Sequence, residues 1–400
     1  MEEQRHQAYE LAQYQSLPLE AKVRMTQRRI EDWYNHFNGD VYVSFSGGKD
    51  STVLLHLVRE LYPEVPAVFS DTGLEYPEIK AFAKSHDNVI VVRPKMGFKE
   101  VISTHGYPII SKEVSESIKY ARKIGGGGIH KSNKREELHG QRTFVHRGGT
   151  SDNLIDTSVA RNRRTVLLGQ WHSPEGAEKS MFNKEKWLPV ARDLPVMISN
   201  YCCNVMKKQP IKQFQHKNKL FPFIGTLAEE SLVRKQAWMR HGCNAFDSRN
   251  PSSQPMSFWT EQDVLTYIAE NNIPICSVYG DIVYKDQDGM EYEPNELTCG
   301  KLQCTGCQRT GCVFCGYGAH LDKVPRFRLL KETHPQLYRY CINGGEWRDN
   351  PNYVPGAPEY DGEWKNWNPK KVWMPSIDGL GFGKVFDMIN ELYGKEIYKF

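Results

Sequence analysis

The stretch VYVSFSGGKDS (41–51) joins a strand pattern to a helix pattern through a turn rich in glycine and hydroxyl groups. Its apolar residues alternate over 41–45, as in a strand that enters a core, and from position 52 they recur at helical spacing. Gly47 and Gly48 leave the N–H groups at the helix start open to an anion, and Lys49 adds a positive charge. The spacing differs from that of a Walker A loop. We therefore predict a phosphate-binding turn, with an ordinary glycine-rich connection as the alternative.

The residues around this turn continue the alternation of strands and helices. Strands are expected at 41–45, 65–70, 88–93 and 220–226, and helices at 51–62, 77–84, from 229 onward, and after the capping-box-like stretch TEQD (260–263). This alternation predicts an α/β fold with a doubly wound, mainly parallel sheet and helices on both faces. Ligands bind at the carboxyl ends of the strands in such sheets, where the turn and the stretch DTGLEYP (71–77) both fall.

The composition is that of a soluble globular protein. The chain has 400 residues, of which 39% are hydrophobic and 25% charged. Its first twenty residues are polar and no apolar run approaches 18 residues, which argues against secretion and against a membrane protein, so we expect a cytoplasmic location. Ten cysteines without an export signal favour reduced thiols and metal ligation over disulfides. The formal net charge of +4 is too small to indicate a nucleic-acid partner by itself.

Three segments are expected along the chain: a helical segment at 1–38, an α/β nucleotide-binding domain at 39–275, and a Cys-rich metal-binding and C-terminal module at 276–400. Within the second segment, 111–165 is a basic insertion with 12 Lys and Arg against 6 Asp and Glu, and it ends in the cluster Arg161, Arg163 and Arg164. Two interpretations stay open for this insertion. It is either a solvated, mobile segment or a surface for a polyanion, such as a nucleic acid or substrate phosphates.

Cysteines gather in two places. The stretch CTGCQRTGCVFC (304–315) contains two C-x-x-C pairs, a density that indicates metal binding, and Cys202 and Cys203 are adjacent. Adjacent cysteines do not easily chelate one zinc ion, but they can reach two irons of a cubane cluster. The alternatives are a four-cysteine zinc site within 304–315 and an iron–sulfur cluster that joins both places. The other cysteines, at 243, 276, 299 and 341, are expected in the core.

Several of these motifs resemble the phosphoadenosine phosphosulfate (PAPS) reductase family, a branch of the PP-loop adenine nucleotide alpha hydrolase superfamily. The resemblance rests on SGGKDS (46–51), SDTGLEYPE (70–78) and PMSFWTEQDVLTYI (255–268), and it covers roughly 38–120 and 195–320. The pair YCCNVMKKQP (201–210) and GCVFC (311–315) is similar to the cysteine signature of the 4Fe–4S members. That similarity implies a 4Fe–4S cluster on Cys202, Cys203, Cys312 and Cys315, with Cys307 or Cys304 as substitutes and zinc as the alternative.

The resemblance also implies a nucleotide site. Its residues come from the first strand and its turn, from the edge of the next strand and from GTLAEESLVR (225–234): Ser44, Ser46, Gly47, Gly48, Lys49, Asp50, Ser51, Asp71, Thr72, Gly73, Gly225 and Arg234. Lys49, Asp50 and Arg234 are the expected catalytic residues, with Mg²⁺ held by Asp50 or Asp71. The first arginine of the family's Gly-x-Arg element is replaced here, which leaves Arg234 as the anion contact; a surface ion pair with Glu230 is its alternative role.

One departure from the family concerns the nucleophile. Sulfonucleotide reductases carry a cysteine in a C-terminal Glu-Cys-Gly-Leu-His segment, whereas this chain ends in GKEIYKF and has only Cys341 beyond the metal motif. A reductase needs a thiolate to take the sulfuryl group.

Three functions are therefore weighed. The first is an enzyme that cleaves ATP to AMP and pyrophosphate, and so activates an acceptor for sulfur transfer; the acceptor could be a nucleic acid bound by the basic insertion. The second is a reductase of PAPS or adenylylsulfate that releases sulfite, with a thiol from Cys341 or from a thioredoxin-like or sulfur-donor partner. The third is a non-catalytic subunit that senses adenine nucleotide. Pyrophosphate release separates the first function from the others.

Overall fold

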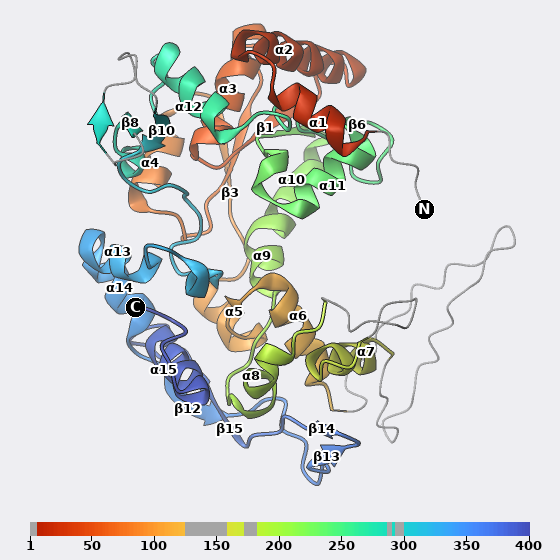
Figure 1. The fold of residues 1–400 in the computed structure, drawn as a ribbon, viewed down its shortest axis with the longest axis vertical. Helices are drawn as coiled ribbons and strands as arrows, with labels where there is room; N and C mark the ends of the chain where they lie inside the picture. Colours follow the sequence, from red (N-terminus) through yellow and green to blue (C-terminus); the bar gives the residue numbers. More distant parts are fainter. Residues whose placement is uncertain (1–5, 125–157, 172–181, 286–289, 293–299) are drawn as a thin grey trace, which may run out of the picture. The chain divides into compact units, whose positions relative to one another are not determined.

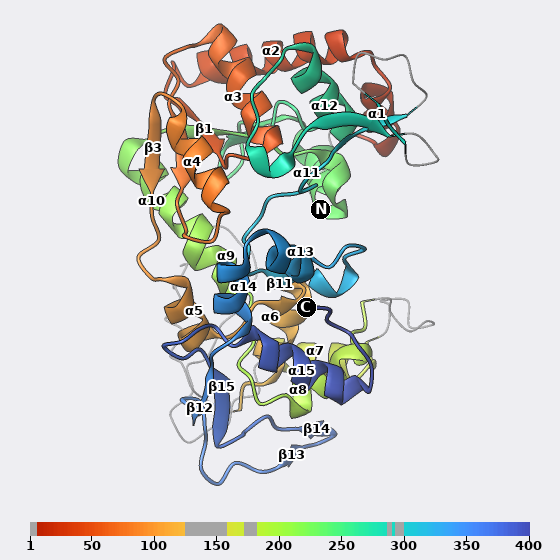
Figure 2. The same ribbon diagram turned by 90° about the vertical axis from the view of Figure 1, so that its left-hand side faces the viewer.

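A computed structural model describes residues 6–124, 158–171, 182–285, 290–292 and 300–400. The chain forms two compact units, and each unit is built from two stretches of sequence. The first unit contains 1–97 and 204–313, and the second contains 98–203 and 314–400. Figure 1 and Figure 2 give the course of the chain through each unit. These units differ from the three expected segments, because the basic insertion belongs to the second unit and the Cys-rich segment is divided between the two.

The first unit is an α/β domain. Its strands are β1 (Val41–Phe45), β2 (Ala67–Ser70), β3 (Val89–Val92), β5 (Phe221–Ile224), β6 (Asn244–Ala245), β7 (Ser252–Ser253), β8 (Ile282–Lys285), β9 (Glu291–Tyr292) and β10 (Lys301–Cys304). Its helices are α1 (Ala8–Gln15), α2 (Leu19–His36), α3 (Lys49–Leu61), α4 (Pro77–Ser85), the π-helix Asn204–Lys208, α10 (Gln209–Asn218), α11 (Leu232–His241) and α12 (Glu261–Glu270), with 3-10 turns at Ala228–Glu230 and Ser277–Tyr279. Each strand and helix expected from the sequence is present, with boundaries shifted by a few residues.

The central sheet has the order β3-β2-β1-β5-β7-β6 and is parallel except for the β6–β7 pair. This confirms the predicted mainly parallel α/β fold. The strand order reverses at β1, because β2 pairs with one side of it and β5 with the other. In open α/β sheets this switch point is where ligands bind, outside the carboxyl ends of the strands. The SGGKDS turn leaves the carboxyl end of β1 and therefore lies at that point.

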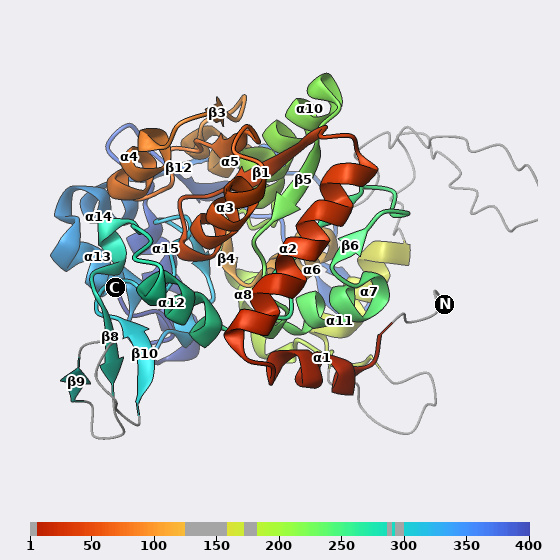
Figure 3. The same cartoon turned by 90° about the horizontal axis from the view of Figure 1, so that it is seen from above.

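The two faces of β1 are buried under different helices. Val41, Val43 and Phe45 belong to the core cluster that also contains the apolar residues of α2 and α3, and Figure 3 shows these two helices beside β1. Tyr42 points to the opposite face, where its ring packs edge-on against Phe214 of α10 at 5.5 Å. Burial on both faces explains why the strand reads as an almost continuous apolar run. It also holds the end of β1, and thus the turn after it, in a fixed place.

The second unit is mainly helical. Its helices are α5 (Phe98–His105), α6 (Lys112–Ala121), α7 (Ser158–Leu167), α8 (Leu188–Asp193), α9 (Tyr201–Cys203), α13 (Arg326–Thr333), α14 (Pro335–Ile342) and α15 (Phe382–Tyr393), with 3-10 turns at Glu185–Trp187 and Ala319–Leu321. Its strands are β4 (Ile109–Ile110), β11 (Gly316–Tyr317), β12 (Glu346–Asp349), β13 (Tyr360–Asp361), β14 (Trp364–Lys365) and β15 (Lys371–Met374).

Both ends of the basic insertion form helices. The described part forms α6 and α7, while 125–157, with the tetraglycine, lies outside the described residues. Arg164 is buried: its guanidinium donates to the carbonyls of Ala121 and Lys123 at the end of α6 and pairs with Asp361. The side chain of this arginine is therefore committed to packing within the unit, whereas Arg161 is exposed.

Arg122, directly after α6, donates hydrogen bonds to backbone carbonyls. Among the described residues, no carboxylate lies within hydrogen-bond distance of its guanidinium. Its guanidinium donates to four carbonyl oxygens, of Val190, Ala191, Leu194 and Val196, at 2.5–3.0 Å, and it lies 4.2 Å from the centre of the Trp367 ring. Because burial removes its hydration, the pKa of Arg122 is lowered well below its ordinary value. The Leu194 carbonyl also accepts from the Val196 N–H and the Trp367 indole N–H, whereas Arg122 is the donor to the other three carbonyls. Within the described residues, no helix is both long and apolar enough to cross a membrane.

Replacing Arg122 with methionine should destabilise the protein strongly. The substitution removes the donor of the Val190, Ala191 and Val196 carbonyls, and each unsatisfied group costs roughly 1–3 kcal/mol. We expect the free energy of unfolding to fall by at least about 3 kcal/mol in urea titrations followed by circular dichroism. Arg339→Met, at an exposed position of α14, is the control and should change it by less than about 0.5 kcal/mol. An Arg122→Met protein as stable as the control would contradict this role.

Candidate nucleotide-binding site

The turn after β1 is shaped by one glycine in a left-handed conformation. Gly47 has a φ of +73°, and a Cβ on it would lie 3.0 Å from the Ile79 side chain and 3.1 Å from the Ile79 carbonyl. Both the backbone and the space thus require glycine at this position. Gly48 then caps α3, so that the first N–H groups of the helix face the pocket.

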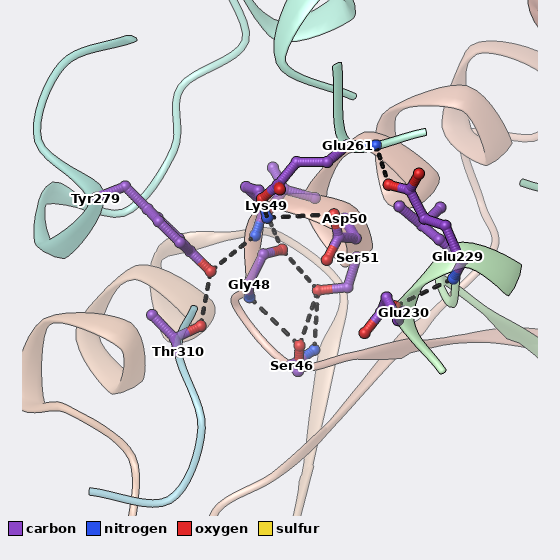
Figure 4. Close-up of polar contacts among 12 residues, drawn as sticks. Ser46, Gly48, Lys49, Asp50, Ser51, Glu229, Glu230, Glu261, Tyr279 and Thr310 are labelled. Atoms are coloured by element: carbon purple, nitrogen blue, oxygen red, sulfur yellow. Dashed lines mark hydrogen bonds and ion pairs between the residues drawn. The ribbon is translucent and has the colours of Figure 1, made fainter. Parts of the chain in front are cut away.

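Side-chain hydroxyl groups accept hydrogen bonds from the N–H groups of the turn (Figure 4). The Ser46 N–H donates to Ser51 Oγ at 3.2 Å, and the Gly48 N–H donates to Ser46 Oγ at 3.3 Å. The Lys49 N–H donates to the hydroxyl of Tyr279 at 3.1 Å, which comes from a distant part of the chain. The turn therefore presents a row of donors to oxygen acceptors, which is the chemistry of an anion nest.

Gly225 follows β5 and closes the other side of the turn. A Cβ at this position would lie 3.0 Å from the Asp50 carbonyl oxygen and 3.2 Å from the Ser51 Cα, so β5 approaches the start of α3 backbone to backbone. This close approach brings the next residues of the chain, which include Glu229 and Glu230, to the same pocket. The two ends of neighbouring parallel strands thus build one site.

Lys49 and four carboxylates meet in this pocket. Its lining includes Ser46, Gly48, Lys49, Asp50, Glu229, Glu230 and Glu261. Lys49 is 5% exposed, and its ammonium lies 3.1 Å from Glu261 Oε1 and 3.7 Å from Asp50 Oδ1 (Figure 4). Glu229 accepts a hydrogen bond from the Glu261 N–H at the start of α12, and Glu230 accepts one from the Leu227 N–H at 3.1 Å.

Burial and charge act in opposite directions on Lys49. Burial is the largest single influence and favours the neutral amine, but Asp50 and Glu261 together outweigh it, so the pKa of Lys49 is raised. Burial also raises the pKa of Asp50, with Glu230 and Glu261 adding to the rise and Lys49 opposing it. Burial likewise raises the pKa of Glu229. The lining of the pocket therefore has more carboxylates than cations, and a further cation in the pocket would stabilise the ionised form of these carboxylates.

The remaining wall comes from the segment 276–313. Tyr279, Arg309 and Thr310 line the pocket, and the hydroxyls of Tyr279 and Thr310 are 2.6 Å apart. Arg309 is exposed. Burial raises the pKa of Asp50, and the positive charge of Arg309 opposes this rise, as that of Lys49 does, so both cations face the same site. Part of the Cys-rich stretch thus contributes polar groups to the nucleotide pocket.

The DTG stretch does not line this pocket. Asp71 is buried, and its carboxylate pairs with Lys80 at 3.0 Å, Lys84 at 3.3 Å and Arg93 at 3.5 Å. Burial raises the pKa of Asp71, but the two lysines outweigh it and the pKa is lowered. Thr72 forms a turn in which its N–H and hydroxyl donate to Glu75. Nucleotide contact by Asp71, Thr72, Gly73 and Ser44 stays a prediction from the family resemblance.

Arg234 also lies apart from the pocket lining. It pairs with Glu230 one turn earlier, at i−4, and its side chain is half-exposed. This is the surface ion pair that the sequence offered as its alternative role. Arg309 is the arginine that the structure places beside Lys49 in the pocket lining.

The predicted cluster ligands fall into both units. In the second unit burial is the main cause of the raised pKa values of the half-buried Tyr317 and of Cys315. Cys203, Cys202 and Cys315 add to the rise for Tyr317, and Cys203 adds to the rise for Cys315. Cys304, Cys307 and Cys312 belong to the first unit. Within the described parts of the chain, no three His, Cys, Asp or Glu side chains are arranged to hold a metal ion. Three of the predicted ligands therefore belong to one unit, and a cluster held by them stays a prediction from the family resemblance.

Three of the four cysteines expected in the core are confirmed there. Cys243, Cys276 and Cys341 are buried, and Cys299 lies outside the described residues. Cys341 is 0% exposed, and burial raises the pKa of its thiol well above the ordinary value. A raised pKa lowers the thiolate fraction at every pH below it, so this cysteine lacks the features of a nucleophile.

Sequence reasoning missed Glu261, Tyr279, Arg309 and Thr310. The position of Glu261, though not its role, could be predicted, because the capping box of Thr260 and Asp263, which the structure confirms, makes it the first residue of α12. Arg309 and Thr310 lie inside CTGCQRTGC, a stretch that was interpreted from its cysteines alone, as a metal-binding motif. Tyr279 carries no sequence signal of its own.

The chain is similar to several known proteins. The family model of the phosphoadenosine phosphosulfate reductase domain matches residues 40–142 and 133–316. Sulfate adenylyltransferase subunit 2 of a Rhizobium species is 22% identical over 337 residues, which cover 78% of this chain and 92% of that protein. An uncharacterised protein of Methanocaldococcus jannaschii is 28% identical over 170 residues, which are 38% of this chain but only 40% of that protein.

Two further similarities are more local or more distant. The phosphoadenosine 5'-phosphosulfate reductase of Serratia proteamaculans is 36% identical over 56 residues, 14% of this chain and 23% of that enzyme. The crystal structure of a PAPS reductase from Candida auris, a phosphate complex, is similar with a TM-score of 0.32 and 12% identity, over 66% of this chain and 91% of that one.

Cys341 should resist alkylation in the native protein. Its thiol is buried and its pKa is raised, so we expect less than about 10% modification by iodoacetamide at pH 8 under conditions that alkylate a free thiol fully. Tryptic peptides analysed by mass spectrometry measure the extent at each cysteine, and the protein unfolded in urea is the control, in which Cys341 should react completely. Rapid native modification would make this cysteine a candidate nucleophile again.

Proposed function

The chain belongs to the phosphoadenosine phosphosulfate reductase domain family, and on this premise we propose that it is an enzyme of nucleotide-linked sulfur metabolism that uses ATP. It binds ATP in the pocket beside the SGGKDS turn and transfers the AMP group to an oxygen of the acceptor, with release of pyrophosphate. Attack of the sulfur donor on this activated acceptor then releases AMP. The relatives named as sulfate adenylyltransferase subunit 2 and PAPS reductase support an adenine nucleotide as the ligand.

The charge of the pocket is the observation that favours ATP. Among the described residues that line it, the carboxylates of Asp50, Glu229, Glu230 and Glu261 outnumber the cations Lys49 and Arg309, although Glu230 is also paired with Arg234. A bare anion entering such a pocket meets an excess of negative charge, which is unfavourable at low dielectric. A polyphosphate that carries a divalent cation meets a lining that suits it, because carboxylate oxygens are the ligands of Mg²⁺.

The residues fit a magnesium ion that is shared with the substrate. Among the described residues Asp50 Oδ1 is buried and accepts no hydrogen bond, and burial raises the pKa of this carboxyl group. Mg²⁺ is usually held by one or two carboxylates together with substrate phosphates, rather than by a cage of protein groups. Asp50 and Glu261 would hold the ion here, and when bound it would neutralise charge on the phosphates.

The protein groups then have distinct roles. The N–H groups of the turn bind phosphate oxygens, and the Lys49 ammonium, kept charged by Asp50 and Glu261, stabilises the negative charge that shifts to the leaving pyrophosphate. Arg309 supplies a second cation with a planar fork suited to phosphate oxygens. Glu229 and Glu230 cap α12 and the turn after β5, which keeps this wall in place.

Other parts of the proposal rest on the family resemblance. A 4Fe–4S cluster, with zinc as the alternative, would use the thiols of Cys202, Cys203 and Cys315 in the second unit. A nucleic-acid acceptor and a thioredoxin-like or sulfur-donor partner are proposed on the same ground. Release of sulfite from PAPS has less support, since it needs a reactive thiol and Cys341 is buried.

Incubation with MgATP and candidate acceptors should release pyrophosphate and AMP. We expect no sulfite from PAPS in a parallel reaction, and no pyrophosphate from Lys49→Met, which loses the ammonium that stabilises the leaving group. Chelation of the metal with EDTA should also abolish pyrophosphate release. Sulfite from PAPS would establish the reductase, and nucleotide binding without turnover across a panel of acceptors would favour a sensing subunit.

Arg309 and Arg234 provide a matched pair of variants. Arg309→Ala should lower kcat/KM for ATP by roughly 10- to 100-fold, because a charged hydrogen bond to phosphate is lost. Arg234→Ala should change it by less than about threefold, since its guanidinium pairs with Glu230 at the helix surface. Steady-state kinetics with pyrophosphate detection measure both. The opposite ranking would restore Arg234 as the anion contact.

A further inference from the structure

Tyr279 reaches the anion nest from outside the turn. Its side chain is 2% exposed, its hydroxyl accepts the Lys49 N–H at 3.1 Å, and Thr310 Oγ1 lies 2.6 Å from the same hydroxyl. A Cβ on Gly48 would lie 3.2 Å from the Tyr279 hydroxyl, so this oxygen sits directly against the backbone of the turn (Figure 4). The hydroxyl oxygen thus accepts from the N–H that an incoming phosphate oxygen would need.

The backbone that carries Tyr279 is fastened to the Cys-Thr-Gly-Cys stretch. The Gly306 N–H donates to the Tyr279 carbonyl and the Cys307 N–H to the Val278 carbonyl, both at 2.8 Å. Thr305 and Asp281 add two bonds: the Thr305 N–H donates to the Asp281 carbonyl, and the Asp281 N–H donates to the Thr305 hydroxyl oxygen, each at 2.9 Å. These four bonds form a clamp between 278–281 and 305–307.

Glycine makes this clamp possible. A Cβ on Gly306 would lie 2.5 Å from the Val278 carbonyl oxygen and 2.9 Å from the Tyr279 carbonyl carbon, distances that no side chain tolerates. Gly280, with a φ of +65°, turns the chain where the Thr305 hydroxyl approaches. Tyr279 therefore cannot shift far without the stretch 305–307, and Thr310 follows three residues later.

We propose that Tyr279 is a positioning residue that holds the phosphate nest in the nucleotide-free protein and is displaced by the bound phosphate. The inference rests on the proposed nucleotide function. One N–H cannot serve two acceptors at full strength, so the Tyr279 hydroxyl and the phosphate oxygen compete for Lys49 N–H. Through the clamp, displacement moves the stretch 305–310, and with it Arg309 and Thr310, whenever the nest is filled.

The test compares Tyr279→Phe with wild type, using inorganic pyrophosphate with Mg²⁺ as the probe. The variant removes only the competing hydroxyl, so pyrophosphate should bind roughly two- to tenfold more tightly in isothermal titration calorimetry, the size of one net hydrogen bond. Tyr267→Phe removes a buried hydroxyl of α12 that is outside the pocket lining, and its affinity should equal that of wild type. Equal or weaker binding by Tyr279→Phe would overturn the displacement, and so would a wild type that binds no pyrophosphate.

Hydrogen–deuterium exchange tests the transmission through the clamp. In wild type, pyrophosphate should change the exchange of a peptide that covers 301–313 as well as that of the turn. Protection confined to the turn would overturn the transmitted movement. Failure of the proposed reaction is a separate result, because it shows as bound nucleotide without pyrophosphate release, whichever affinity the two tyrosine variants have.

Discussion

The buried ammonium of Lys49 is the constraint on which the pocket depends. A cation at this depth loses most of its hydration, and it stays charged only because Glu261 and Asp50 lie at 3.1 and 3.7 Å. That requirement ties together parts of the chain more than two hundred residues apart. Gly47 turns the chain so that Lys49 begins α3, and Thr260 caps α12 so that Glu261 is its first residue.

The same constraint explains why the site suits a metal–polyphosphate complex. Carboxylates gathered to hold one lysine leave an excess of negative charge once Glu229 and Glu230 join them from the end of β5. Burial is the main cause of the raised pKa values of Asp50 and Glu229, and the nearby carboxylates of Glu230 and Glu261 add to both rises. A divalent cation that arrives with the substrate relieves this repulsion. The free protein is thus prepared for a ligand that brings its own positive charge.

The sequence predicted the fold and the turn well, because both are local patterns. Alternation over 41–45, helical spacing after 52 and the two glycines need no information from the rest of the chain. The roles of Asp71 and Arg234 were harder to predict, since a residue after a strand or in the first turn of a helix can face either the pocket or a neighbouring side chain. Lys80 and Lys84, one turn apart on α4, hold Asp71, and Glu230 holds Arg234. Tyr279 and Arg309 depend on long-range packing, for which the sequence carries no periodic signal.

The two C-x-x-C pairs have different physical explanations. Around Cys304 and Cys307 the spacing serves a backbone clamp, because Thr305 bonds to Asp281 and Gly306 permits contact with Val278. Cys304 is a buried strand residue of β10, and burial raises the pKa of its thiol to about 11. No such account covers Cys315, whose thiol lies near Cys203 in the second unit. The spacing of the first pair therefore has an explanation in packing, and metal binding by the cysteines of both pairs stays a prediction from the family resemblance.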